Sequence, residues 1–254
     1  MLHLNRKQIR FEVKNDAVIN YNYNYEIMTY LYKSFTEINE KKALKLHDEG
    51  YRVDGKTYKL FNFIILFKDA KFTDKGIEVK KGDTLKLLIS GESSTLNNMI
   101  KGIIKVGKLN LFGCQLEPTE LLNDEPIKFK NKMLYKVCSP IVEKTYDAEK
   151  SITRYTNPMQ KEFYTALAQN LKRKYKLIYD KEYEGELHFD IDNTLKIKNK
   201  AINLIKGNGQ IKGTGKYEIW VQADRDMQRV VYYCGLGQNN STGAGFLNYI
   251  VGRD

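Results

Sequence analysis

Two hydrophobic periodicities follow one another along the first half of the chain. Residues 8–13, QIRFEV, alternate apolar and polar side chains as a half-buried strand does, and residues 25–35 place Ile27, Met28, Leu31 and Phe35 on one helical face. The pattern further predicts strands at 59–67, 76–79 and 84–90, an amphipathic helix at 95–106 and a closing strand at 108–117. This order of strand, helix, two strands, helix and strand is typical of a ferredoxin-like unit.

A second unit follows a segment in which two of the four prolines, Pro118 and Pro126, lie between apolar patterns, as they do in linkers. Beyond that segment the pattern predicts strands at 133–142, 185–191, 216–223 and 244–250, a long helix at 158–178 and a short helix at 224–234. We therefore expect an α+β protein with two tandem ferredoxin-like domains, 1–122 and 123–254.

The charge balance favours a polyanionic partner. The 254 residues include 42 Lys and Arg against 31 Asp and Glu, which gives a net charge of +11 and an isoelectric point near 9.3. Nucleic acid and an acidic membrane both fit this charge. The longest apolar run, 61–67, is too short to cross a bilayer, and the first residues lack the apolar core of a secretory signal. We expect a soluble, cytoplasmic protein without a membrane partner.

The cysteines and the glycine motifs give no indication of a cofactor. Cys114, Cys138 and Cys234 are an odd number without C-x-x-C spacing, so we expect reduced core thiols and no zinc site. Residues 235–240, GLGQNN, lack the third glycine of a dinucleotide-binding loop, and residues 207–216 lack the pattern of a nucleoside-triphosphate loop. We expect neither a metal nor a cofactor.

A lysine-rich segment supplies more than half of the net charge. Between Asn193 and Lys216 there is no carboxylate, and the six lysines are Lys196, Lys198, Lys200, Lys206, Lys212 and Lys216. Asn208-Gly209 is a favourable two-residue hairpin turn, so the lysines are expected on a β-ribbon. Such a ribbon can follow a phosphate backbone. A solvated edge hairpin, whose lysines prevent strand addition, explains this segment equally well.

Three side chains of the first half carry candidate chemistry. His47 ends a helical pattern just before a glycine-bearing loop, where side chains face clefts more often than cores. Tyr32 lies at the margin of the apolar helical face, and Lys59 stands at the entrance of a buried strand. Each also has an ordinary explanation, as a surface histidine, a core-edge aromatic and a solvated lysine. The other histidines, His3 and His188, are expected at the surface.

The segments YNYNYEIMTYLYKSF, LHDEGY, KLFNF, PMQKEFYTALAQNLKRKY and CGLGQNNSTGAGFLNYI occur in this order through nearly the whole chain. Together they resemble the CRISPR-associated repeat-processing endoribonucleases, of the RAMP superfamily. The resemblance implies two ferredoxin-like domains with an RNA-binding cleft, and it places the catalytic residues on Tyr32, His47 and Lys59, with Lys56 as a competitor for the lysine. It also implies RNA contacts by the ribbon and by a loop of the form G-x-G … S-x-G-x-G: Lys206, Lys212, Lys216, Gly235, Gly237, Ser241, Gly243 and Gly245.

The activity that this resemblance implies is metal-independent cleavage of CRISPR repeat RNA in a precursor transcript. The 2′-hydroxyl attacks the adjacent phosphate and leaves a 2′,3′-cyclic phosphate and a 5′-hydroxyl, with His47 as acid or base. An interference complex and a second copy of the chain are further candidate partners. Two alternatives stay open: a non-catalytic repeat-RNA-binding subunit, and a protein whose basic face docks an acidic protein.

Overall fold

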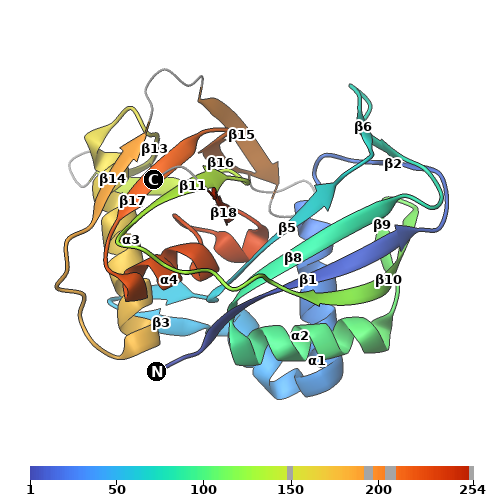
Figure 1. The fold of residues 1–254 in the computed structure, drawn as a ribbon, viewed down its shortest axis with the longest axis horizontal. Coiled ribbons are helices and arrows are strands. Elements are labelled where there is room, and N and C mark those ends of the chain that lie inside the picture. The colour runs from blue at the N-terminus through green and yellow to red at the C-terminus, as the bar shows by residue number, and fades with distance from the viewer. Residues whose placement is uncertain (148–150, 192–196, 204–209, 252–254) are drawn as a thin grey trace.

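The computed structural model describes residues 1–147, 151–191, 197–203 and 210–251. Its N-terminal half is a ferredoxin-like unit, drawn from blue to green in Figure 1. The unit consists of β1 (Leu4–Val13), α1 (Asn24–Asp48), β5 (Phe61–Phe67), β8 (Thr84–Glu92), α2 (Ser93–Val106), β9 (Leu109–Leu111) and β10 (Cys114–Asn123). The strand predicted at 108–117 is therefore two strands, because the chain turns at Phe112-Gly113, where both residues have a positive φ.

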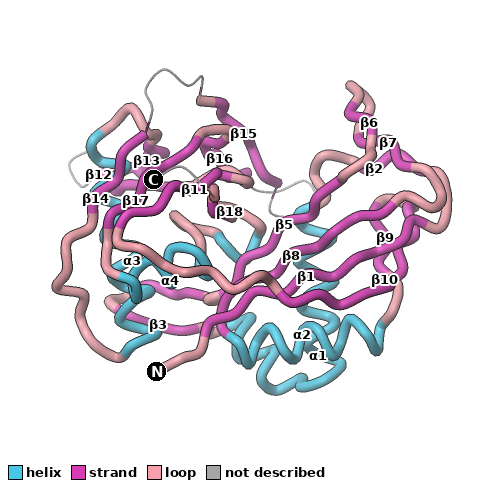
Figure 2. The backbone as a smooth tube through the Cα atoms, viewed as in Figure 1, coloured by secondary structure: helices cyan, strands magenta, loops and turns pink. Residues whose placement is uncertain are grey.

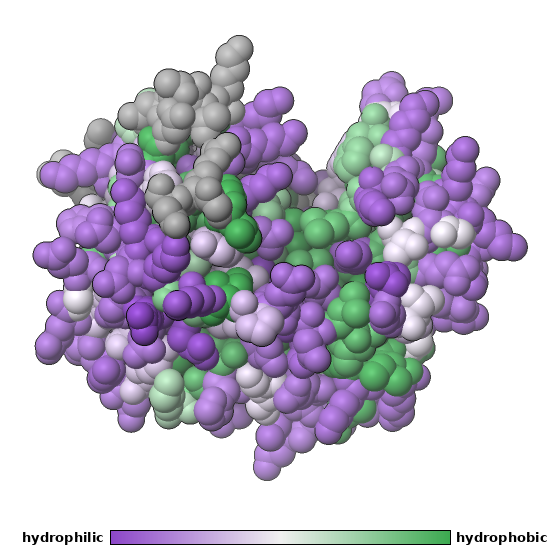
Figure 3. All heavy atoms as spheres, in the orientation of Figure 1, coloured by the Kyte–Doolittle hydropathy of each residue, from purple (hydrophilic) through white to green (hydrophobic). Residues whose placement is uncertain are grey.

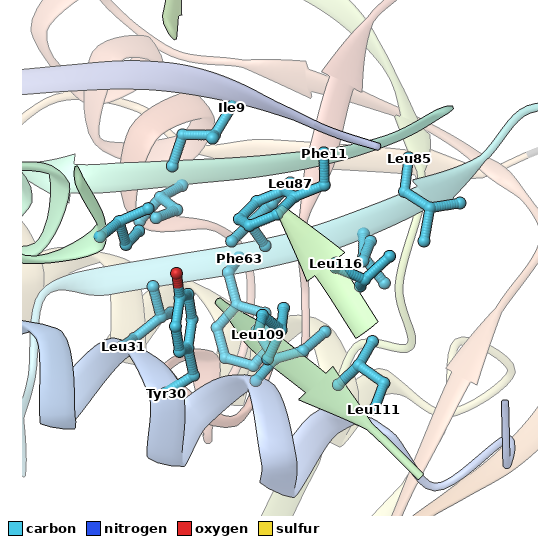
Figure 4. Packing of buried hydrophobic residues seen from close by; sticks show 14 of the residues in the cluster. Ile9, Phe11, Tyr30, Leu31, Phe63, Leu85, Leu87, Leu109, Leu111 and Leu116 are labelled. Carbon is cyan, nitrogen blue, oxygen red and sulfur yellow. The ribbon is translucent and has the colours of Figure 1, made fainter. Parts of the chain in front are cut away.

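The N-terminal sheet has the strand order β5-β8-β1-β10-β9, and every pairing in it is antiparallel. Its β1 is paired on both sides, with Phe11 opposite Leu85 of β8 and opposite Pro118 of β10. Both helices pack on one face of this sheet, where Phe11 and Phe63 meet Tyr30 and Leu31 of α1 (Figure 4).

The C-terminal half repeats the topology. It consists of β11 (Lys132–Val137), α3 (Lys161–Tyr179), β14 (His188–Ile191), β17 (Glu218–Gln222), α4 (Arg225–Cys234), a 3₁₀ turn (Asn240–Thr242) and β18 (Leu247–Tyr249). The strand order is β14-β17-β11-β18, again antiparallel. The prediction of two tandem ferredoxin-like units is confirmed, since both sheets have the order second, third, first and fourth strand.

Short hairpins are added to the two ferredoxin-like units (Figure 2). They comprise β3 (Tyr51–Val53) with β4 (Lys56–Tyr58), β12 (Glu143–Asp147) with β13 (Ile152–Thr156), and β15 (Lys198–Asn203) with β16 (Gln210–Gly215). A small sheet of β2 (Ala17–Ile19), β7 (Ile77–Val79) and β6 (Lys71–Phe72) projects from the N-terminal half. In Figure 3 this projection and the β15–β16 side of the molecule enclose a hollow with an apolar floor and hydrophilic rims.

Side-chain caps fix where the functionally important helices begin. The backbone of α1 is non-helical at Asn39, and Asn39 Oδ1 accepts a hydrogen bond from the N–H of Lys42. Asn39 thus acts as an internal N-cap, and the helical segment beyond it carries Leu46 and His47. Asp224 caps α4 by accepting from the N–H of Met227. The two caps therefore fix where the helical segments begin that lead to His47 and to the loop after α4.

Arg6 joins the two units. It lies on β1 but is only 1% exposed, and its guanidinium donates to Tyr232 O, Leu247 O and Asn248 Oδ1 of the C-terminal half. The guanidinium carbon also lies 3.6 Å from the Tyr232 ring centroid, a cation–π contact. A buried cation with this many partners holds the N-terminal sheet against α4 and β18.

The predicted core thiols agree with the structure for Cys114 and Cys234, which are buried, whereas Cys138 is half-buried. Within the described ranges, no helix is long and apolar enough to cross a membrane.

Candidate active site

A cleft of about 830 Å³ lies between the two units. One wall is the segment 56–61 of the N-terminal unit, and the other walls are β12, α3 and the chain that follows α4. The lining is strongly basic, because it includes two carboxylates, Glu143 and Glu162, against six cations: Lys56, Lys59, Lys144, Lys161, Arg173 and Lys174. Such a surface attracts a polyanion.

Tyr32 and His47 meet beside this cleft, although they belong to different segments of α1. Their ring centroids are 5.1 Å apart with the planes at 85°, and the Tyr32 ring also lies 5.7 Å from that of Phe61. His47 Nδ1 lies 2.8 Å from Asp48 Oδ1, and the His47 side chain is 63% exposed. Burial raises the pKa of the Tyr32 hydroxyl far above its ordinary value, so this group stays protonated.

Lys59 completes the group. Its ammonium donates to the carbonyl oxygens of Leu46 and His47, the last turn of α1, where a cation is favoured by the helix dipole. Burial lowers the pKa of Lys59. The nearby Arg52 lowers this pKa further, and Asp48 acts in the opposite direction. Leu60, the next residue, adopts a positive φ of 50° and packs into the C-terminal core, which fixes where Lys59 stands.

Lys56 competes with Lys59 for the lysine role. It is exposed on β4 opposite Val53 and also lines the cleft. The structure therefore brings Lys59 to His47, and leaves Lys56 on the cleft wall.

The glycine-rich loop after α4 is packed against the protein. Gly235, Gly237, Gly243 and Gly245 are buried and have φ values between 69° and 83°. A Cβ on Gly245 would lie 1.8 Å from the Leu236 carbonyl oxygen, so a side chain there has no room. These glycines therefore have a conformational and packing role of their own. The residues between them, Asn239, Asn240 and Ser241, line the cleft together with Gly237.

The lysine ribbon is present as the β15–β16 pair. In its register Ala201 lies opposite Lys212, and Lys200 lies opposite Gly213. Because neighbouring residues of a strand point to opposite faces, Lys200 and Lys212 lie on opposite faces of the ribbon. Lys212 and Lys216 are exposed, whereas Lys206 and the Asn208-Gly209 turn lie outside the described residues. Lys200 Nζ lies 5.9 Å from the Tyr23 ring centroid, and both line a second, small pocket beside β5.

Two cleft residues, Lys174 and Glu143, were not predicted from the sequence as site residues. Lys174 is only 2% exposed, and burial lowers its pKa to about 8, while Glu143 is 1% exposed and burial raises its pKa to about 7. The segment around Lys174 is typical of the polar face of a helix. The helical spacing nonetheless indicates burial of Lys174, because this residue follows Leu171 by three residues and precedes Ile178 by four, on the apolar stripe of α3.

Within the part of the chain that the structure describes, no three His, Cys, Asp or Glu side chains come together in a group that could hold a metal ion.

Comparisons with known proteins agree on one family. The family profile described as "CRISPR associated protein Cas6, C-terminal" matches residues 123–249, and that described as "CRISPR-associated protein Cas6, N-terminal" matches residues 18–120. The "CRISPR-associated endoribonuclease Cas6 1" of Methanocaldococcus jannaschii is 27% identical over 248 residues, which are 95% of this chain and 91% of the relative.

Two further proteins are similar over nearly their full length. The "Putative CRISPR-associated endoribonuclease-like protein Cas6nc" of Pyrococcus horikoshii is 24% identical over 94% of this chain and 96% of its own. A solved structure of "CRISPR associated protein Cas6" superposes with a TM-score of 0.79 at 25% identity, covering 98% of this chain and 100% of that one. With both of its halves matched, the chain belongs to the Cas6 family of CRISPR-associated proteins.

Proposed function

We propose that this protein is a metal-independent endoribonuclease that cleaves CRISPR repeat RNA in the precursor transcript and thereby releases guide RNAs. The observation that carries the proposal is the meeting of Tyr32, His47 and Lys59 at the end of α1, beside a cleft lined by six cations and two carboxylates. Membership of the Cas6 family and the name of the relative from Methanocaldococcus jannaschii support it.

His47 transfers the proton in this mechanism. When its Nδ1–H donates to Asp48, the neutral ring presents Nε2 as a proton acceptor, which suits removal of the 2′-hydroxyl proton. The 2′-oxygen then forms a bond to the adjacent phosphorus. The bond from phosphorus to the 5′-oxygen breaks, which leaves a 2′,3′-cyclic phosphate and a 5′-hydroxyl once the leaving oxygen is protonated. General acid and base catalysis of this kind contributes about a hundred- to ten-thousandfold.

Tyr32 and Lys59 assist His47 in this mechanism. The high pKa of Tyr32 makes its hydroxyl a hydrogen-bond donor that orients the ribose or the phosphate. Lys59 uses two of its three N–H groups on backbone carbonyls, so one remains to stabilise the charge that develops on the phosphorane.

The RNA backbone follows the basic surfaces. Residues 1–122 carry the catalytic group, and residues 123–254 supply Lys206, Lys212, Lys216 and the loop from Gly235 to Gly245. These groups position the repeat through its phosphates without reading its sequence. We place the activity in the cytoplasm. An interference complex and a second copy of the chain stay candidate partners.

The proposal is tested by incubating the protein with its cognate repeat RNA in EDTA. We expect cleavage with a cyclic phosphate end, and none when a single 2′-deoxy nucleotide precedes the cut. Cleavage of the deoxy substrate would contradict the mechanism.

One observation favours a second function, binding of repeat RNA without cleavage. The His47 side chain is 63% exposed and stands beside the cleft rather than in its lining. If this function is correct, repeat RNA is recovered intact after long incubation, and His47→Ala changes nothing.

A further inference from the structure

The unusual group in the cleft wall is the ammonium of Lys174. It extends from α3 beneath the glycine-rich loop, and the residue is 2% exposed. Its three donors are all used: Nζ lies 2.9 Å from Gly235 O, 3.1 Å from Gly237 O and 2.7 Å from Asn240 Oδ1. All three acceptors belong to one loop. Lys174 therefore ties both ends of the segment 235–240 to a single point on α3.

These acceptors are neutral, and among the described residues no carboxylate oxygen lies within 4.0 Å of Lys174 Nζ. Burial of an ammonium without an ion pair is costly, and burial lowers the pKa of Lys174 to about 8, with Cys234 and Glu143 acting in the opposite direction. A leucine or methionine at this position of the apolar stripe would avoid the cost. The positive charge of Lys174 is therefore explained by the loop that its ammonium group holds in place.

The Asn240 side chain connects Lys174 to other parts of the loop by hydrogen bonds. While its Oδ1 accepts from Lys174, its Nδ2 donates to Leu236 O and Ala244 O, each at 3.0 Å. The two arms of the loop are closed by Leu236 N–H, which donates to Gly245 O at 3.0 Å. Rotation of the Asn240 amide would thus break three hydrogen bonds at once. Lys174 fixes which edge of this amide faces the helix.

A second anchor holds the neighbouring residue. Gln238 Nε2 donates to Glu143 Oε2 at 2.9 Å, and Gln238 N–H donates to Val142 O at 2.8 Å. Beside these two anchors, Asn239, Asn240 and Ser241 line the cleft.

We propose that Lys174 is a positioning residue, whose buried ammonium holds the glycine-rich loop in the one conformation that presents Asn239, Asn240 and Ser241 to RNA in the cleft. The affinity for RNA then depends on a charge that lies beneath the loop rather than on its surface. The role in RNA binding rests on the proposed function, whereas the anchoring of the loop does not.

The test compares Lys174→Met, which keeps an unbranched apolar side chain and removes the ammonium group, with Lys172→Met on the exposed face of the same helix. Lys174→Gln, a neutral side chain that retains N–H donors, serves if the methionine variant does not fold. Circular dichroism and thermal unfolding establish that each variant is folded. Hydrogen exchange of the peptide 235–246 then reports on the loop in the free protein, and the dissociation constant and the single-turnover rate report on repeat RNA.

For folded Lys174→Met we expect exchange of the loop peptide to accelerate about tenfold or more, with α2 unchanged, and repeat RNA to bind about tenfold more weakly. Cleavage of bound RNA should stay within about threefold of the original rate, because the catalytic group lies on the other unit. Lys172→Met should leave the loop unchanged.

Unchanged loop exchange, or unchanged affinity despite faster exchange, would overturn the proposal. If neither variant at Lys174 folds, the lysine is a structural core residue and the proposal is likewise wrong. If the original protein does not bind repeat RNA, the proposed function fails, and the exchange experiment still decides whether Lys174 holds the loop.

Discussion

Two glycines with the same φ separate the effect of conformation from that of packing. Gly245 in the glycine-rich loop and Gly55 in the turn between β3 and β4 both have a φ of 69°. A Cβ on Gly245 would lie 1.8 Å from Leu236 O, whereas a Cβ on Gly55 would meet nothing within 4 Å. Gly245→Ala and Gly55→Ala are therefore a matched pair.

The expected magnitudes follow from this geometry. The positive φ costs an alanine about 1 kcal/mol at either position. At Gly245 the backbone must also move, which breaks the bond from Leu236 N–H and strains those of Asn240, each worth about 1 kcal/mol. We expect Gly55→Ala to lower the free energy of unfolding by about 1 kcal/mol and Gly245→Ala to lower it by about 3–4 kcal/mol.

Thermal unfolding followed by circular dichroism measures the difference. A protein of this size loses roughly 2–4 °C in Tm per kcal/mol, so we expect a shift of about 3 °C for Gly55→Ala and about 10 °C for Gly245→Ala. Equal shifts for the two variants would refute the reasoning, because packing of the loop would then contribute nothing.

Three further outcomes are expected. Glu143→Gln should stabilise the protein at pH 7.5 but hardly at pH 5. Burial raises the pKa of Glu143 from 4.5 to about 7, so the stability that the protonated carboxyl provides is lost as pH rises through 7. Urea unfolding should therefore show that the stability advantage of the glutamine variant grows by about 2 kcal/mol between pH 5 and pH 7.5. Arg6→Ala should cost about 3–5 kcal/mol in the same assay, because it leaves three acceptors, two of them in buried hydrogen bonds, without their donor. Arg10→Ala on the exposed side of β1 should cost under about 1 kcal/mol, and similar costs for the two variants would contradict the role of Arg6 as the link between the units. The affinity for repeat RNA should fall steeply between roughly 50 and 200 mM salt, and a flat response would favour the docking of an acidic protein instead.

The order of elements could be predicted because the core strands and helices bury one face each. Ile9, Phe11 and Val13 recur at period two. Ile27 and Leu31 recur at helical spacing, and both patterns follow directly from burial. The β3–β4 and β12–β13 hairpins were not predicted. Their strands are short and largely polar, so burial leaves no periodicity in them. The family expected from the motifs is confirmed by both halves of the chain.

The candidate site was predictable in its residue types but not in its geometry. Tyr32 and His47 are fifteen residues apart, a spacing that on an unbroken helix would put more than 20 Å between them; the break at Asn39 brings their rings together. The return of Lys59 to the end of the same helix depends on a hairpin of polar residues. The buried role of Lys174 depends on three acceptors that lie more than sixty residues away in the sequence.

The central claim is that the His47 imidazole transfers a proton during RNA cleavage. The most direct measurement is the single-turnover cleavage rate of repeat RNA by His47→Ala at saturating protein, with His188→Ala as the control. His188 is a fair control because its side chain is 65% exposed and lies beside Glu186, much as that of His47 is 63% exposed and lies beside Asp48. We predict that His47→Ala binds RNA normally and loses at least about a hundredfold in rate, with His188→Ala unaffected. An undiminished rate for His47→Ala would contradict the account.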